Sequence, residues 1–182
     1  MSALPSVTHI LKEVGLGPEF DFVDPVTLEA ACLRGTAVHE AIEAHAYGYL
    51  DEATLSPIAA PYLDGYKKFL SESGHETIAT EVEVVHPSWQ YIGHLDRVGW
   101  LLGKRAILDF KTPESLDLKP AGYQLALYRL AWNAQHPDQP VDVIGVLQLK
   151  SDGTYRFHDL NPAVYEQVAL AAVIVYRARK ER

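Results

Sequence analysis

The feature that most limits what this chain can fold into is a change of sequence period after residue 76. Three short stretches rich in β-branched and aromatic residues follow, at residues 80–86, 91–101 and 105–111, and turn residues separate them. This pattern predicts three antiparallel strands that run directly into one another. The sheet is therefore expected to begin as a meander.

Helical spacing surrounds these strands on both sides. Asp24 and Pro25 are suited to begin one helix, and Gly74 is suited to end another. In chain order, the further expected elements are helices at residues 26–50, 56–73 and 120–135, strands at 141–149 and 154–160, and a helix at 162–179. Helices before and after about five strands predict an α/β or α+β domain with helices packed on the faces of the sheet.

The length and composition are typical of one globular domain. Of the 182 residues, 48% are hydrophobic and 22% are charged. We expect a single domain over residues 1–182, with a helical part at about 1–76 and a sheet core at about 77–160. The longest apolar run, residues 168–176, is far shorter than the roughly 20 residues of a membrane span, and no signal-peptide pattern is visible. These observations predict a cytoplasmic protein with no membrane partner.

The single cysteine, Cys32, restricts the metal chemistry. One cysteine cannot build a disulfide framework, a cysteine-based zinc site or a four-cysteine iron–sulfur cluster within the chain. Any metal ion must therefore be held by oxygen and imidazole ligands.

The net charge of -8 is unevenly distributed. Residues 1–76 hold 12 acidic and 4 basic side chains, whereas residues 77–182 hold 12 of each. Proteins that bind nucleic acid usually show a basic surface. An acidic chain can still act on nucleic acid if carboxylates hold divalent cations, because each ion adds two positive charges where phosphate must lie.

Three carboxylates are expected to lie in a row across the first three strands. A turn at Leu102-Gly103 places Asp96 opposite Asp109, and a turn at residues 87–90 places Glu81 opposite Asp96. Side chains opposite each other on antiparallel strands share one face, with Cβ atoms about 4.5–5.5 Å apart. The same registers predict a second row on that face, formed by Glu83, His94 and Lys111.

A row of like charges destabilises a sheet unless a cation compensates it. Mg²⁺ prefers oxygen ligands, and two facing aspartates can reach one ion. The alternative is that the acidic residues form a solvated sheet face. Asp109 argues against that alternative, since it interrupts the apolar stretch 106–110 and an unpaired buried carboxylate is costly.

Four motifs follow one another along the chain: residues 34–40 (RGTAVHE), 93–97 (GHLDR), 109–111 (DFK) and 124–128 (QLALY). In this order they resemble the PD-(D/E)XK nuclease superfamily, and more narrowly its RecB-like exonuclease branch. The resemblance implies a restriction-endonuclease-like core with a central mixed sheet flanked by helices. The sequence departs from many members of the branch because it cannot hold their iron–sulfur cluster.

The resemblance also implies roles for individual residues. His39, Asp96, Asp109 and the Phe110 carbonyl would bind Mg²⁺ or Mn²⁺, and Lys111 would position and activate water. Glu81 is favoured as the upstream acidic residue, with Glu83 as the alternative. The expected DNA-binding residues are Gln124, Tyr128 and Arg34. Without the resemblance, His39 would be interpreted as a structural histidine, Tyr128 as a core residue and Arg34 as a surface charge.

The expected function is therefore a metal-dependent deoxyribonuclease, preferably an exonuclease acting on linear or single-stranded DNA ends. A partner protein in recombination or repair is compatible with this function. Two alternatives are a nucleic-acid binding module without turnover and a metal hydrolase that acts on small phosphate esters. The sequence leaves open the strand polarity, the choice between DNA and RNA, and the oligomeric state.

Overall fold

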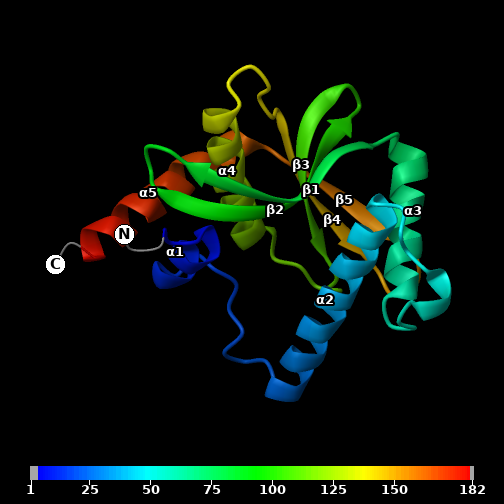
Figure 1. Ribbon diagram of the computed structural model, residues 1–182. Helices are drawn as coiled ribbons and strands as arrows, with labels where there is room; N and C mark the ends of the chain where they lie inside the picture. Colours follow the sequence, from blue (N-terminus) through cyan, green and yellow to red (C-terminus); the bar gives the residue numbers. More distant parts are fainter. Residues whose placement is uncertain (1–3, 181–182) are drawn as a thin grey trace.

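The computed structural model describes residues 4–180, and its centre is a five-stranded mixed sheet flanked by helices, as predicted (Figure 1). The strands are β1 (Glu76–His86), β2 (Tyr91–Leu101), β3 (Lys104–Lys111), β4 (Val143–Leu149) and β5 (Tyr155–Leu160). The helices are α1 (Val7–Glu13), α2 (Pro25–Ala46), the short 3-10 helix η1 (Glu52–Thr54), α3 (Ala60–Ser73), α4 (Leu118–Gln135) and α5 (Pro162–Lys180).

The strands lie in the sheet in their chain order, from β1 to β5. The first three form the antiparallel meander that the sequence predicts, and β4 and β5 form an antiparallel hairpin. β4 runs parallel to β3, so the chain must cross over between them, and α4 makes this crossover. The parallel pair makes the sheet mixed and brings the start of α4 next to the end of β3.

The sheet has a hydrophobic core on each face. α4 and α5 contribute to one core with Ile107 of β3, and α1 packs against both helices. α2 and α3 contribute to the other core with Leu108 and Phe110 of β3. β3 is thus covered on both faces, which explains its continuous apolar sequence. Asp109, whose relative exposure is only 2%, is the exception that needs a chemical explanation.

The element boundaries differ from the sequence predictions mainly at exposed ends. β2 was predicted to the residue, whereas β1 begins four residues before the predicted position 80 because its exposed first residues still pair with β2. α2 ends at Ala46 instead of residue 50, since Gly48 takes a left-handed φ of 74°. α1 was not predicted, because seven residues are too few to show a helical period.

The predicted registers are confirmed on both sides of the carboxylates. Val98 pairs with Ile107, and Glu83 pairs with His94. Leu102 and Gly103 both have positive φ, as expected for a tight hairpin turn between β2 and β3.

The second predicted row is wrong. Glu83 and His94 form an exposed pair, with Oε2 and Nε2 3.3 Å apart, but Lys111 does not join them. The pairing of β2 with β3 stops at Arg97 and Leu108, so no ladder carries the register on to Lys111. Glu81, at a φ of 50°, breaks the regular alternation of β1 at the same level. The two neighbouring strand irregularities separate side chains that an ideal sheet would align.

Within residues 4–180, no helix is both long enough and apolar enough to cross a membrane.

Two helical glycines make a matched test of the packing. A Cβ on Gly65 of α3 would lie 2.7 Å from the backbone oxygen of Thr154, whereas one on Gly35 of α2 would meet nothing within 4 Å. We expect Gly65→Ala to lower the free energy of unfolding by about 1–3 kcal/mol through overpacking. Gly35→Ala should raise it by about 0.5–1 kcal/mol through helix propensity. Urea unfolding of both variants measures the difference, and equal effects would contradict the described packing of α3.

Candidate active site

The site begins where β2 separates from β3. Alternation along β3 directs the N–H and C=O of Phe110 toward β2, beyond the last paired residues. Side chains replace the missing strand partner: Phe110 N–H donates to Asp96 Oδ2 at 2.7 Å, and His39 Nε2 is 3.1 Å from the Phe110 carbonyl oxygen. The backbone of Phe110 is therefore held between a residue of β2 and a residue of α2.

The hydrogen bond at Phe110 also orients the His39 ring. A carbonyl oxygen can only accept, so Nε2 carries the proton and donates it. Nδ1, the other ring nitrogen, lies 3.8 Å from Asp96 Oδ2. Histidines that bind metal ions commonly have this arrangement, in which the second ring nitrogen donates to a carbonyl or carboxylate.

Glu81 completes a group of possible metal ligands. One ligand atom from each of His39, Glu81 and Asp96 lies within 4.8 Å of the others, and among the described residues this is the group that meets such a criterion. Of the two glutamates considered from the sequence, the structure brings Glu81 to this group and leaves Glu83 on the surface beside His94.

Asp109 and Lys111 form an ion pair next to this group. Lys111 Nζ lies 2.6 Å from Asp109 Oδ2. This oxygen is buried and has no well-directed hydrogen-bond donor in the part of the chain that the structure describes. Burial alone would lower the pKa of Lys111, but the charges of Asp109 and Asp96 outweigh burial and raise that pKa. Lys111 is thus held in its charged form.

The acidic groups carry an unfavourable charge. Burial, and then the charge of Asp109, raise the pKa of Asp96 to about 7, although His39 and Lys111 act in the opposite direction. Burial likewise raises the pKa of Glu81. A cation placed among these carboxylates would reverse both effects. The donor set, the buried Asp109 oxygen and the raised pKa values together fit a divalent cation.

Gln124 and Tyr128 lie four residues apart on one face of α4, and Gln124 links Tyr128 to Asp109. Gln124 Nε2 donates to Tyr128 Oη at 3.0 Å and approaches Asp109 Oδ1 at 3.4 Å. The Tyr128 ring is buried and fills the space above Gly93, where a Cβ would come within 2.4 Å of it. Glycine at position 93 therefore lets α4 approach β2 at the site.

Comparison with known proteins identifies the family of the chain. A sequence model described as the PD-(D/E)XK nuclease superfamily matches residues 50–179. The chain belongs to this superfamily. The family match and the fold confirm the resemblance drawn from the motifs. No match was found among curated proteins.

The similar solved structures are distant in sequence. A protein from Eubacterium rectale, assigned as an exonuclease, is 16% identical, with a TM-score of 0.56 over 94% of this chain and 71% of that chain. An alkaline exonuclease from Laribacter hongkongensis is 10% identical, with a TM-score of 0.49 over 64% of this chain and 63% of that chain. In this alignment the PD-(D/E)XK chain spans less than two thirds of the Laribacter exonuclease.

Arg97 is a charged residue at the site to which the sequence analysis gave no role. Its side chain is fully buried, with the guanidinium 5.5 Å from the Tyr66 ring centroid and 5.6 Å from that of Phe110. Nη1 donates to Thr77 Oγ1 at 2.6 Å. Its charge favours the ionised forms of Asp96 and Glu81, because opposite charges attract in a poorly solvated environment. The sequence signal was a charged residue between the buried positions Leu95 and Val98.

Gln148 of β4 is a second residue that sequence reasoning missed. It is buried next to Lys111 in the parallel ladder, and its Nε2 donates to the backbone oxygens of Pro113 and Glu114 at 2.7 and 3.0 Å. These bonds hold the segment that follows β3. Arg34 approaches the same segment, since its Nε lies 3.4 Å from Thr112 Oγ1. A buried polar residue in an otherwise apolar strand was the available signal.

The raised pKa of Asp96 predicts how the stability of the metal-free protein depends on pH. The folded protein holds this proton more tightly than the unfolded chain, so the free energy of unfolding falls as pH rises from about 4 to about 7 and then stays low. Asp96→Asn removes the charge and keeps an acceptor for Phe110 N–H. We expect it to stabilise the metal-free protein by about 1–3 kcal/mol at pH 8, and to have little effect at pH 4.

Denaturant unfolding in the presence of a chelator measures this effect. Glu83→Gln is the control, because Glu83 is exposed and its replacement should leave stability nearly unchanged at both pH values. Equal destabilisation by Asp96→Asn at pH 4 and pH 8 would contradict the burial of a strained charge at this position.

Proposed function

We propose that the protein is a metal-dependent DNA exonuclease that hydrolyses phosphodiester bonds. The observation that carries this proposal is the convergence of His39, Glu81 and Asp96 within 4.8 Å, next to the Asp109–Lys111 ion pair, in a chain of the PD-(D/E)XK superfamily. Carboxylates and an imidazole can hold a divalent ion, and the neighbouring ammonium adds positive charge, so the group suits metal-assisted phosphate hydrolysis. The match to the nuclease superfamily favours a polynucleotide substrate over a small ester.

Mg²⁺ or Mn²⁺ is the proposed cofactor. Asp96, Asp109, the Phe110 carbonyl and His39 would hold it, with Glu81 beside them. The Phe110 oxygen accepts from His39 and retains a second lone pair for an ion. When bound, the ion lowers the pKa of a coordinated water and neutralises charge on the phosphate. Hard oxygen ligands suit both ions.

Lys111 would orient the attacking water and contribute positive charge near the phosphate. Its ammonium is fixed by Asp109 and kept protonated by the nearby carboxylates. A charged ammonium cannot take a proton from water, so its proposed contribution is electrostatic and orientational. The proton of the water would pass to one of the carboxylates or to solvent.

Gln124 and Arg34 are the proposed DNA contacts on either side of the ion pair. Both line the same surface groove as Lys111. Tyr128 is only 4% exposed and accepts a hydrogen bond from Gln124. We therefore assign Tyr128 the task of holding Gln124 in place. This refines the sequence prediction, in which all three residues were expected to bind DNA.

The central test is loss of cleavage in two variants. Asp109→Ala and Lys111→Ala should each lower the rate of Mg²⁺-dependent DNA cleavage at least about 100-fold, since each removes a group that acts on the reacting phosphate. The matched controls are Asp142→Ala and Lys104→Ala, which change exposed residues of the same types. Release of acid-soluble nucleotides measures the rate, and circular dichroism checks folding. Cleavage that persists in both site variants would contradict the assignment.

Metal binding has an independent readout. We expect Mg²⁺ or Mn²⁺ to raise the melting temperature of the wild-type protein, because the ion relieves repulsion among the carboxylates. Asp96→Asn should lose most of that increase. An unchanged melting temperature in millimolar Mn²⁺ would count against a metal site at these residues.

The type of nuclease is tested with end-labelled linear, circular and single-stranded DNA in Mg²⁺, Mn²⁺ or chelator. An exonuclease degrades the linear substrates and leaves the closed circle intact. Cleavage of the circle would indicate an endonuclease. Binding without any release of nucleotides would instead support the alternative of a binding module.

A further inference from the structure

A groove of about 980 Å³ extends from the candidate active site. Its walls are the segment at residues 15–23, the first half of α2, the segment at residues 113–117 and the start of α4. Arg34, Lys111 and Gln124 belong to its lining, so the groove opens directly onto the residues proposed to act on the phosphate. A polynucleotide whose phosphate lies at the candidate active site can therefore continue into the groove.

The lining of the groove is more apolar than cationic. Its apolar side chains include Leu16, Phe20, Val23, Leu28, Leu116 and Tyr123. The charged side chains are three cations, Arg34, Lys111 and Lys119, and two anions, Glu19 and Asp117. The net charge of the lining is thus close to zero, although the groove leads to a phosphate-cleaving site.

This lining chemistry discriminates between forms of nucleic acid. A duplex presents only its charged backbones and groove edges, with one phosphate charge for about every 1.7 Å of axis, and proteins bind it through many Lys and Arg residues. A single strand also exposes the faces of its bases, which stack on aromatic and apolar side chains. An apolar groove with three cations therefore suits an unpaired strand better than a duplex.

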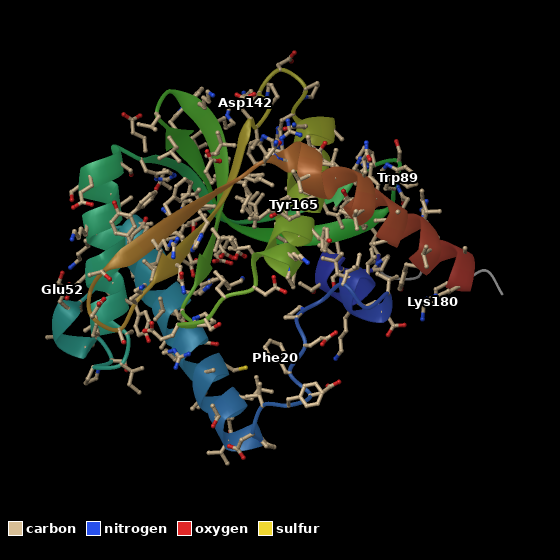
Figure 2. All side chains as sticks on the ribbon, turned by 180° about the vertical axis from the view of Figure 1, so that it is seen from behind. Phe20, Glu52, Trp89, Asp142, Tyr165 and Lys180 are labelled. Atoms are coloured by element: carbon tan, nitrogen blue, oxygen red, sulfur yellow. The ribbon has the colours of Figure 1, made fainter. Side chains whose placement is uncertain are left out.

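Phe20 is the aromatic residue best placed to meet a base. It lies on the segment between α1 and α2, and Figure 2 labels it there. About half of its side chain is exposed, at 49%, although it belongs to the groove lining. Tyr123, the other aromatic residue of the lining, already packs edge to face against Tyr165, with ring centroids 5.7 Å apart. Phe20 has no comparable aromatic partner in the described chain.

We infer that the groove binds an unpaired DNA strand, with a base stacked on Phe20, and that this contact makes the enzyme select single-stranded ends over blunt duplex. The inference rests on the proposed nuclease function and specifies the substrate form. Lys119 and Arg34 would contact the phosphates, and the apolar wall would contact the bases. Phe20 is thus a specificity-determining residue.

Phe22 provides a matched control. It lies two residues away on the same segment and is 95% exposed, but it is not part of the groove lining. Removal of its ring changes the composition of the segment by the same amount as removal of Phe20. Phe20→Trp keeps a stacking surface and serves as the rescue variant.

The experiment compares wild type, Phe20→Ala, Phe20→Trp and Phe22→Ala on three substrates in Mn²⁺. The substrates are a labelled single-stranded oligonucleotide, the same strand in a blunt duplex, and bis(p-nitrophenyl) phosphate, which is too small to fill the groove. We expect wild type to cleave the single strand at least tenfold faster than the duplex. Phe20→Ala should raise KM for the single strand roughly 5- to 100-fold, with the ester rate unchanged. Phe20→Trp and Phe22→Ala should behave like wild type.

Hydrolysis of the ester distinguishes a failure of the proposed function from a failure of the groove assignment. A wild-type protein that hydrolyses neither the ester nor DNA would overturn the proposed function, and the groove assignment with it. Ester hydrolysis combined with equal cleavage of both DNA forms would overturn the groove assignment alone. An unchanged KM in Phe20→Ala, or an equal loss in Phe22→Ala, would likewise overturn the role of Phe20.

Discussion

The structure of the site depends on which groups form hydrogen bonds with the backbone N–H and C=O of Phe110. Buried N–H and C=O groups must find partners, and an unpaired one costs about as much as a lost hydrogen bond. β2 pairs with β3 only from Arg97 onward, so beyond Leu108 the strand that would normally supply these partners is absent. The side chains of Asp96 and His39 supply them instead. The gap between β2 and β3 thereby holds the carboxylate of Asp96 and the imidazole of His39 close together. The hydrogen bonds that hold them are the ones that the buried backbone of Phe110 needs.

The same arrangement makes the site a source of instability. Asp96 and Asp109 bring like charges into a poorly solvated region, and the more exposed Glu81 adds a third acidic group beside them. Burial is the main reason why the pKa of Asp96 rises, and partial burial also raises the pKa of Glu81. Lys111 and the buried guanidinium of Arg97 offset part of this repulsion. Residues that only supported the fold would gain more from apolar packing here. The remaining unfavourable charge is best explained by a function that uses it.

Periodicity and turn residues were sufficient to predict the five strands, the four long helices, the meander and the registers on either side of the site. They failed for the second row of side chains, because the registers assumed ideal alternation. Glu81 has a positive φ and β2 leaves β3 at Asp96, so Lys111 turned toward Asp109 and left Glu83 with His94 on the surface. Gln148 and Arg97 were missed for a related reason: their partners lie 34 and 20 residues away in the chain, and no local pattern encodes such contacts.

The distribution of charge explains how an acidic chain can act on a polyanion. The excess of acid lies in residues 1–76, which include α2 and the segment that carries Phe20. General electrostatic attraction to a duplex is therefore weak on this side of the molecule. In the proposed function, two short-range sources of affinity would remain: a cation held by the carboxylates of the sheet, and stacking of bases on the apolar wall of the groove. Both would act only on a strand whose phosphate reaches the carboxylates and whose bases are free. An acidic surface combined with an apolar groove thus favours selection of substrates by shape and pairing state over binding to any nearby DNA.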